Sequence, residues 1–294
     1  MTIATDKEGF VDAPGGRVWY RIAGGGPGVP LLLLHGGPGA GHDYLEPMEA
    51  LGDERPVVFY DQLGCGKSDI PDDTALWATE RFVREVEAVR QALGLERLHI
   101  LGQSWGGFLA IEYLLGKPSG VVSVVLANTA ASAPGFAREA VKLIDGLPAD
   151  IQETIRRCEA EGSFEDPQYQ AATFTFYQKH LCRLPLPWPD PVMRTIHNSE
   201  TSPCYRYMWG PSEFTMTGTL QTWDRTDRLG EINVPTLVIS GEHDEAQLPL
   251  QEELRDGIPA AEMVILKDAS HLAHFEQPEK YFEAVRNHIR KAEA

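Results

Sequence analysis

The stretch LHILGQSWGGFLAIEYLL, residues 98–115, decides the fold class of this chain. Residues 98–104 form an apolar run of strand length, and residues 108–115 have the character of a buried helix. Between them, residues 102–106 spell GxSxG, the pattern of a nucleophile placed on a tight turn from strand to helix. Such a turn points the Ser104 hydroxyl out at the carboxyl edge of a parallel sheet. The alternative is a serine that only caps the helix after a glycine turn.

The same rhythm of strand and helix extends on both sides of this stretch. Unbroken apolar runs of strand length predict buried parallel strands, whereas the alternating pattern of residues 17–23 predicts a half-exposed antiparallel strand. The expected buried strands cover residues 31–34, 56–61, 98–104, 121–128, 235–240 and the run from 262, and helical spacing marks 79–93, 108–115, 249–256 and 278–291. Alternating strands and helices predict an α/β fold, with a parallel sheet and helices on its faces.

The rhythm changes between residues 129 and 228. This segment has few strand-like runs, several aromatic residues and the proline-rich RLPLPWPDP at 183–191,. We therefore expect a mostly helical insertion, or cap, at 129–228. The α/β core would then consist of a first part, 1–128, and a second part, 229–294.

Composition excludes several classes of function. The chain has 294 residues and a formal net charge of −17, which argues against binding to nucleic acid or to an anionic membrane surface. Its N-terminal stretch, MTIATDKEGF, lacks the basic and apolar regions of a signal peptide, so we expect a cytoplasmic protein without a membrane span. The four cysteines are widely spaced, and neither a zinc site nor a disulfide framework is expected.

The segment YDQLGCGKSD, residues 60–69, ends like a phosphate-binding loop. A phosphate-binding loop needs a glycine five positions before its second glycine, and here that position is Asp61, whose carboxylate would repel a phosphate. No amphipathic helix begins after Ser68. The segment is therefore better explained as a structural turn.

Serine needs a base and an orienting carboxylate before it can attack a carbonyl. In this fold the chain order is serine, acid, histidine, and Asp244 and His271 each follow the end of an expected strand,. We therefore expect Ser104, Asp244 and His271 to converge as a catalytic triad. The competing candidates are Asp268 for the acid, and His243 and His274 for the base. Asp268 lies too close in sequence to His271 to come from another strand end.

The oxygen of the attacked carbonyl gains negative charge, and two backbone N–H groups should stabilise it. One is expected on Trp105, directly after the nucleophile and at a helix N-terminus. The other is expected on Gly37 in HGGPG, residues 35–39, where glycines let the backbone approach the substrate,. Taken alone, HGGPG would be read as an ordinary glycine turn.

Six motifs in one order link these stretches: HGGPG, DQLGCGKS, GQSWGG, WGPSEF, GEHDE and SHLAHFE. Together they resemble the proline iminopeptidase family of α/β-hydrolases, especially its tricorn-interacting aminopeptidase and L-amino-acid amidase branches. The resemblance covers nearly the whole chain. It implies an α/β-hydrolase fold with a mostly parallel eight-stranded sheet, helices on both faces and an inserted helical cap. It also implies that residues 61–68 form a turn beside the active site, with Lys67 facing solvent.

Members of that family remove an unblocked N-terminal residue from short peptides or cleave amino-acid amides. The resemblance therefore implies a serine aminopeptidase or amidase that needs no cofactor or metal and acts on a small molecule or short peptide with a free amino group. The sequence leaves the oligomeric state open, and a monomer is the default expectation. It also implies that Glu213 and Glu245 bind the substrate amine, a role for which buried carboxylates are suited. Without the resemblance, both would be read as solvated surface charges.

Three questions stay open from the sequence. The same triad could serve an esterase, a thioesterase or a lactonase, and a ligand receptor could retain the fold while turning over slowly. An apolar wall for the first side chain of the substrate is expected from the aromatic residues Trp105, Tyr205, Trp209, Phe214 and Trp223, although scattered aromatic residues are usually core. The sequence does not show whether proline is the preferred first residue of the substrate.

Overall fold

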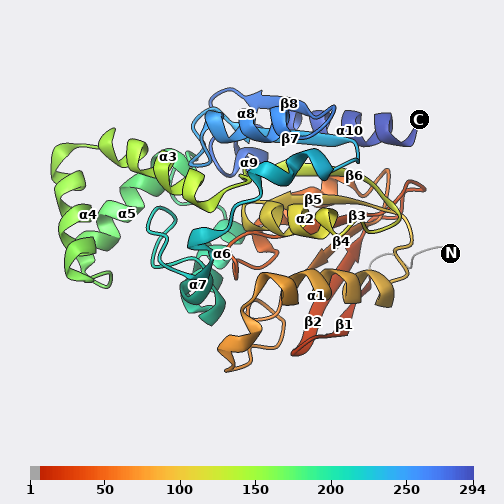
Figure 1. Ribbon diagram of the computed structural model, residues 1–294, viewed down its shortest axis with the longest axis horizontal. Coiled ribbons are helices and arrows are strands. Elements are labelled where there is room, and N and C mark those ends of the chain that lie inside the picture. Colours follow the sequence, from red (N-terminus) through yellow and green to blue (C-terminus); the bar gives the residue numbers. More distant parts are fainter. Residues whose placement is uncertain (1–6) are drawn as a thin grey trace.

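The chain folds around an eight-stranded sheet, seen in the computed structural model, which describes residues 7–294 (Figure 1). The strand order is β1-β2-β4-β3-β5-β6-β7-β8, and β2 pairs antiparallel with both of its neighbours while β4 through β8 are parallel. The strands are β1 (Lys7–Ala13), β2 (Gly16–Ala23), β3 (Leu31–Leu34), β4 (Val57–Tyr60), β5 (Leu98–Gln103), β6 (Val121–Ala127), β7 (Thr236–Gly241) and β8 (Glu262–Leu266). The predicted α/β-hydrolase architecture is confirmed.

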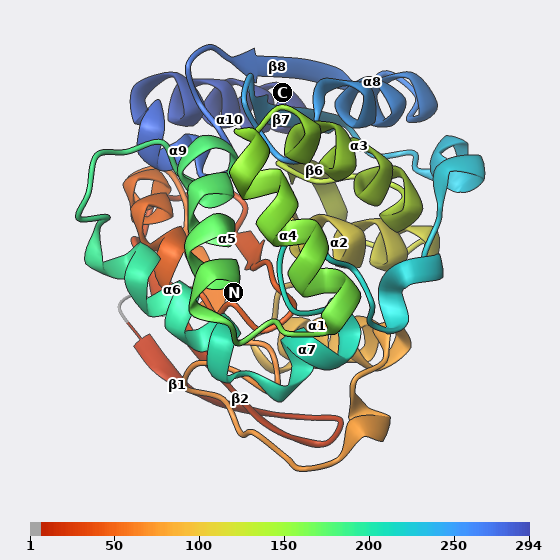
Figure 2. The same cartoon turned by 90° about the vertical axis from the view of Figure 1, so that its left-hand side faces the viewer.

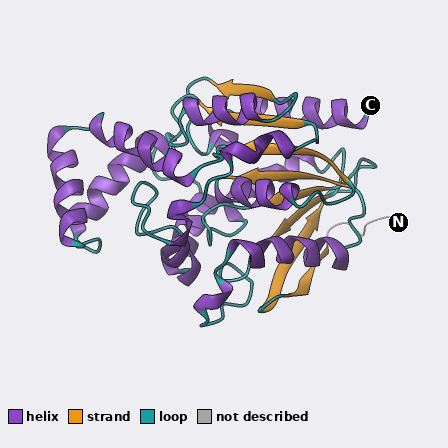
Figure 3. Cartoon of the chain, viewed as in Figure 1, coloured by secondary structure: helices purple, strands orange, loops and turns teal. Residues whose placement is uncertain are grey.

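Helices cover both faces of this sheet, as Figure 3 shows by colour. Two apolar clusters mark the faces: one packs the sheet against α1 (Thr79–Ala92), α2 (Trp105–Leu115) and α8 (Leu248–Gly257). The other packs it against η1 (Asp43–Leu51) and α10 (Pro278–Glu293). All four residues of β3 are buried, as expected for a parallel strand covered on both sides.

The central strands reverse their order at β3, which lies between β4 and β5. The chain therefore leaves β3 toward one edge of the sheet and leaves β5 toward the other. Connections that diverge in this way open a crevice at the carboxyl ends of the two strands, where ligands bind in open α/β sheets. The expected nucleophile follows β5, and HGGPG follows β3.

The segment between β6 and β7 is mostly helical and lies beyond one end of the sheet (Figures 1 and 2). Its helices are α3 (Ala133–Asp145), α4 (Ala149–Glu161), α5 (Pro167–His180), α6 (Asp190–Thr201), α7 (Pro203–Met208), η3 (Thr219–Thr222) and η4 (Thr226–Glu231). Most of the buried apolar side chains of this cap belong to the same cluster as α2, and Cys182, Trp188 and Val192 join the cluster on the other face of the sheet. Phe108 of α2, for example, stacks on Trp223 with ring centroids 4.2 Å apart.

Residues 60–69 form a turn closed around Asp61. The buried Asp61 carboxylate accepts hydrogen bonds from the backbone N–H groups of His42 at 2.7 Å and Lys67 at 2.9 Å. The Lys67 ammonium is exposed and lies 4.1 Å from the ring centroid of Trp19. The backbone N–H groups of His42 and Lys67 thus bind a carboxylate of the same chain, and the segment has a structural role.

Ion pairs attach α10 to the turn before β4. Glu54 contacts the guanidinium groups of Arg286 and Arg290, which outweigh the effect of its partial burial and lower its pKa to about 2. The remaining helix, α9 (Ala273–Glu276), is short. Within residues 7–294, no helix is long and apolar enough to cross a membrane. The N-terminal stretch in which no signal peptide is expected begins with residues 1–6, and these six residues lie outside the described part of the chain.

Candidate active site

Ser104 occupies a strained turn between β5 and α2. Its backbone has φ 56° and ψ −125°, a conformation that few residues other than glycine adopt. The two flanking glycines make this turn possible: a Cβ on Gly102 would lie 2.2 Å from the carbonyl oxygen of Gly106, and a Cβ on Gly106 would lie 1.9 Å from that of Leu34. The sequence GQSWG therefore folds as the tight strand-to-helix turn that a nucleophile elbow requires,.

Asp244 and His271 meet behind this turn. The Nδ1 atom of His271 lies 2.7 Å from Oδ1 of Asp244, and both side chains are buried. The other carboxylate oxygen accepts hydrogen bonds from Nδ2 of Asn128 at 2.6 Å and from the Ser240 hydroxyl at 2.5 Å. The backbone N–H of Ala246 donates to Oδ1 at 2.9 Å. The carboxylate is thus held on every side and orients one nitrogen of the imidazole.

Ser104 and His271 both line a cavity of about 370 Å³ between the sheet and the cap. Within the described part of the chain, the Ser104 hydroxyl makes no hydrogen bond, and Nε2 of His271 lies 3.6 Å from Oε1 of Glu245. Catalytic hydrogen bonds are often long in free enzymes and tighten only when the substrate binds. The expected nucleophile and the expected base therefore line the same cavity.

The competing acid and bases lie elsewhere. Asp268 is exposed, and Nε2 of His243 lies 3.9 Å from the carboxylate of Glu242 on the surface. His274 is buried, and its Nε2 donates to the carbonyl oxygen of Tyr44 at 2.8 Å. None of the three lines the cavity. The geometry therefore favours Asp244 and His271 over the alternatives.

The loop after β3 runs along the same cavity. Gly36 and Gly37 line it, and Gly37 has φ 109°, which favours glycine,. The hydroxyl of Tyr44 accepts the N–H of Gly36 at 2.7 Å and donates to Oε1 of Gln103 at 2.5 Å. This bond fixes the loop to the end of β5. Trp105 opens α2, where the first N–H groups have no partner inside the helix,.

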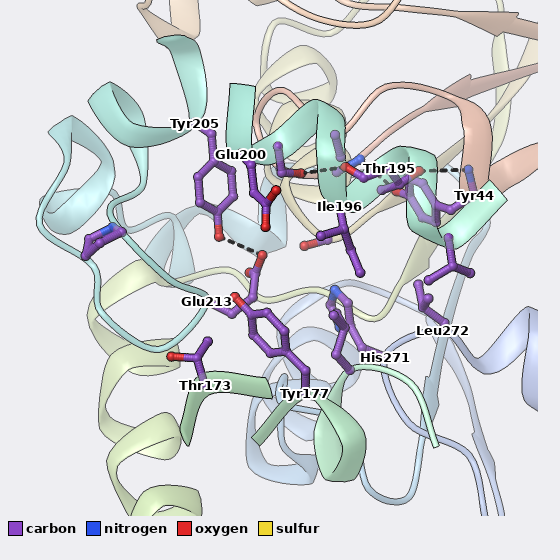
Figure 4. Close-up of a pocket in the computed structure, with 18 of the residues that line it drawn as sticks. Tyr44, Thr173, Tyr177, Thr195, Ile196, Glu200, Tyr205, Glu213, His271 and Leu272 are labelled. Carbon is purple, nitrogen blue, oxygen red and sulfur yellow. Dashed lines mark hydrogen bonds between the residues drawn. The ribbon is translucent and has the colours of Figure 1, made fainter. Parts of the chain in front are cut away.

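Glu213 reaches the cavity from the cap, on the loop that follows α7. Its carboxylate accepts a hydrogen bond from the Tyr205 hydroxyl at 2.7 Å, drawn as a dashed line in Figure 4. Burial raises its pKa, and the bond from Tyr205 and the charge of His271 oppose that effect only in part. Glu213 faces the same cavity as His271 and Tyr177 (Figure 4).

Glu245 is the most unusual group of the site. It is fully buried, and neither carboxylate oxygen has a hydrogen-bond partner among the described residues. Burial raises its pKa well above the usual range. A carboxyl group in such a place stays ionised only when a cation joins it. The imidazole of His271 is the near group that can supply this charge, and the charge of His271 lowers the pKa of Glu245.

Negative charge gathered here also acts on the imidazole. Burial alone would lower the pKa of His271, but the carboxylates of Asp244, Glu245 and Glu213 outweigh it and raise the pKa to about 9. A base that is protonated at neutral pH cannot accept the proton of a serine. The charge of this cluster therefore controls whether His271 can act.

The expected apolar wall was largely wrong. Of the five aromatic residues named from the sequence, only Tyr205 lines the cavity. Trp105, for example, packs on Phe82 in the core and donates its indole N–H to Gln62 at 2.8 Å. Trp209, Phe214 and Trp223 are also buried in the core. The other four aromatic side chains therefore pack in the core and do not form a wall of the cavity.

Sequence reasoning missed the tyrosines that do line the cavity, Tyr44 and Tyr177, and it missed Asn128 behind Asp244. Tyr177 lies within the helical pattern of α5 and carries no motif. Asn128 could have been found, because it follows the end of β6 as Ser104 follows β5 and Asp244 follows the end of β7. A polar residue just beyond the end of a strand is therefore the sequence signal for a side chain of the site.

Among residues 7–294, two clusters of side chains could in principle hold a metal ion, and neither lines the cavity. His42, Asp43 and Glu46 are close together, but His42 is bonded to Asp61, while the guanidinium of Arg194 pairs with Asp43 and with Glu46 at 2.6 Å each. Glu242, His243 and Asp268 form the other cluster at the surface. Neither cluster touches the expected triad side chains.

Comparisons with known proteins agree with this fold. Residues 29–278 match the family described as the alpha/beta hydrolase fold. The chain is 41% identical over 279 residues to a proline iminopeptidase of Heyndrickxia coagulans, covering 95% of this chain and 96% of that one. It also resembles the crystal structure of a proline iminopeptidase of Mycobacterium smegmatis, with a TM-score of 0.90, 36% identity and coverage of 97% and 98% of the two chains. The crystal structure of VinJ superposes with a TM-score of 0.95 at 35% identity, over 98% of this chain and all of that one. The chain therefore belongs to the proline iminopeptidase family of α/β-hydrolases.

Proposed function

We propose that this hydrolase is a serine aminopeptidase that releases an unblocked N-terminal residue, with proline as the first candidate, from short peptides or amino-acid amides. The names of its relatives support the preference for proline. The observation that carries the proposal is a pair of buried carboxyl groups near the imidazole of His271: Oε1 of Glu245 lies 3.6 Å from Nε2, and Glu213 lines the same cavity as His271. A substrate ammonium would supply the positive charge that these groups lack.

In the proposed reaction, Ser104 attacks the carbonyl carbon next to the bound amine, and His271 takes the hydroxyl proton. The backbone N–H groups of Gly37 and Trp105 stabilise the oxyanion. His271 then gives its proton to the leaving amine, which departs as the acyl-enzyme forms. Water, activated by the same imidazole, releases the amino acid and restores the Ser104 hydroxyl. Asp244 keeps the imidazole in the required tautomer throughout.

Glu213 and Glu245 also account for the removal of a single residue. A substrate blocked at its amine would bury these two carboxylates without a counter-charge, and each buried group left unpaired costs about 1–3 kcal/mol. A penalty of 2–6 kcal/mol for the pair corresponds to roughly 30-fold to 10⁴-fold in rate. An internal peptide bond would carry the same penalty, because its nitrogen is uncharged.

A panel of matched substrates tests this function. L-proline p-nitroanilide, its N-acetyl derivative, and the corresponding p-nitrophenyl esters are compared for kcat/KM with the wild-type chain and with Ser104→Ala. We expect the free-amine anilide to be cleaved at least 30-fold faster than the acetylated one, and Ser104→Ala to lose this activity while keeping its circular dichroism spectrum. Equal rates on blocked and free substrates, or full activity without the hydroxyl, would contradict the proposal.

The esters separate the aminopeptidase from the esterase alternative. An esterase that uses the same triad has no reason to prefer a free amine, so acetylation should leave its kcat/KM for the ester unchanged. An aminopeptidase should show the same preference for the free amine in both series, because the ammonium binds before either bond breaks. Equal kcat/KM for free and acetylated substrates in both series would favour the esterase.

A further inference from the structure

We propose that Glu245 has a second task as a positioning residue: it holds the Nε2 side of His271 in the free enzyme, and the arriving substrate ammonium takes over this carboxylate and frees the imidazole to act as a base. The substrate would thus switch on the group that attacks it. The inference rests on the proposed function, because it assumes that the ammonium binds at Glu245.

The geometry of His271 supports this inference. Its Nδ1 atom is occupied by Asp244 at 2.7 Å, and its Nε2 atom, the one that must accept the serine proton, lies 3.6 Å from Oε1 of Glu245. Both Glu245 oxygens lack a hydrogen-bond partner within the described residues, and the side chain is fully buried. The imidazole therefore lies between two carboxylates and is the nearest cationic group that Glu245 contacts.

Charges on the surrounding elements act in the same direction. Glu213, from the loop after α7, adds a third negative charge that favours the imidazolium. Burial raises the pKa of the neighbouring hydroxyls of Tyr177 and Tyr205 and lowers the pKa of His180 and His274, so these groups are neutral near pH 7. Three exposed charged side chains also line the cavity: Arg206 and Glu165, which pair with each other, and Glu200. The imidazolium is thus the buried cation beside these carboxylates.

Binding of a cation changes this balance. An ammonium placed between Glu213 and Glu245 offsets their charge and repels the imidazolium, so the proton on Nε2 becomes easier to release to solvent. No covalent bond changes in this step. The deprotonated Nε2 can then accept the proton of the Ser104 hydroxyl when that hydroxyl attacks. A water molecule or a substrate without an amine brings no such charge and leaves the base protonated.

The pH dependence of serine labelling tests the inference without any substrate turnover. Methanesulfonyl fluoride, which has no amine, reacts with Ser104 only when His271 is neutral, so the midpoint of its rate against pH reports the state of the imidazole. We expect a midpoint near pH 9 for the free wild-type chain. Saturating L-prolinol, an amine without a carbonyl to attack, should lower the midpoint by at least one pH unit, which raises the labelling rate at pH 7 about tenfold.

Two variants complete the test. Glu245→Gln should have a midpoint at least one unit below that of the wild type and should not respond to prolinol. Glu242→Gln removes a carboxylate from the same loop whose side chain is 48% exposed, and it should behave as the wild type. A prolinol-independent midpoint in the wild type overturns the inference, and so does an unshifted midpoint in a folded Glu245→Gln. A failure of the proposed function appears separately, as equal cleavage of free and acetylated anilides.

Discussion

The tautomer of His271 depends on Asp244, and Asp244→Asn tests how strongly. The carboxylate accepts hydrogen bonds from Nδ1 of His271 and from Nδ2 of Asn128, 2.7 Å and 2.6 Å away, on its two oxygens. An introduced amide can accept on one side only. If its oxygen faces the imidazole, its NH₂ group meets the NH₂ group of Asn128. If its NH₂ group faces the imidazole, Nδ1 must accept, and Nε2 then carries the proton and cannot take one from serine.

The expected loss in rate follows from the same distances. Two unit charges 2.7 Å apart at an effective dielectric constant of 20 attract by about 6 kcal/mol, and desolvation of the buried pair offsets part of this. We expect a net loss of roughly 4–5.5 kcal/mol in transition-state stabilisation, which corresponds to a kcat about 10³-fold to 10⁴-fold lower. The assay is release of p-nitroaniline from L-proline p-nitroanilide between pH 6 and 10.

The double variant Asn128→Asp with Asp244→Asn is the matched control. The introduced carboxylate at position 128 can accept from the introduced amide and hold its oxygen toward His271, which restores the tautomer but not the adjacent charge. Position 128 has φ 49°, which aspartate tolerates nearly as well as asparagine. We expect the double variant to recover at least tenfold over Asp244→Asn. A single variant within tenfold of wild type at every pH would refute this reasoning.

Three further outcomes are expected. Tyr205→Phe removes the hydrogen bond to Glu213 and should raise KM for the free-amine anilide about tenfold, while labelling of the serine by methanesulfonyl fluoride continues,; an unchanged KM would remove that bond from substrate binding. Gly106→Ala should fail to fold or melt far below the wild type, because its Cβ would lie 1.9 Å from the Leu34 carbonyl oxygen, and a native melting temperature would contradict the elbow geometry. The pKa of Glu54 is lowered, so its stabilising effect is complete above its unfolded-state pKa near 4.5 and is lost as the pH falls toward about 2,. In urea titrations, Glu54→Gln should therefore lose about 1–3 kcal/mol of unfolding free energy at pH 7 and match the wild type near pH 2.

The fold could be predicted because its strands are buried on both faces. Leu31–Leu34 and Thr236–Gly241 are entirely buried, and such strands appear in sequence as unbroken apolar runs. Strand β1 was missed, because Lys7–Ala13 lies at the sheet edge and is largely exposed, with charges and a glycine in place of an apolar run. Edge strands carry this weaker signal because only one side of their backbone is paired.

The site was predictable where a side chain follows a strand end and hidden where a helix supplies it. Ser104, Asp244 and His271 follow β5, β7 and β8, so the sheet determines their proximity. Tyr44 and Tyr177 were missed, because η1 and a cap helix supply them and no local pattern encodes how these helices pack around the cavity. The charge state of His271 also depends on distances between groups far apart in the chain, which a sequence does not contain.

The stack of Phe108 on Trp223 has a consequence for how substrate selectivity can change. Because the apolar side chains of the cap join the clusters on both faces of the sheet, the cap has no separate interior and should unfold together with the sheet in one cooperative step. A cap grafted from another protein must therefore present apolar side chains that fit those of this sheet, because a cap that does not fit would expose them to water. A new specificity would then arise by substitutions at the contact between cap and sheet and not by exchange of the whole cap.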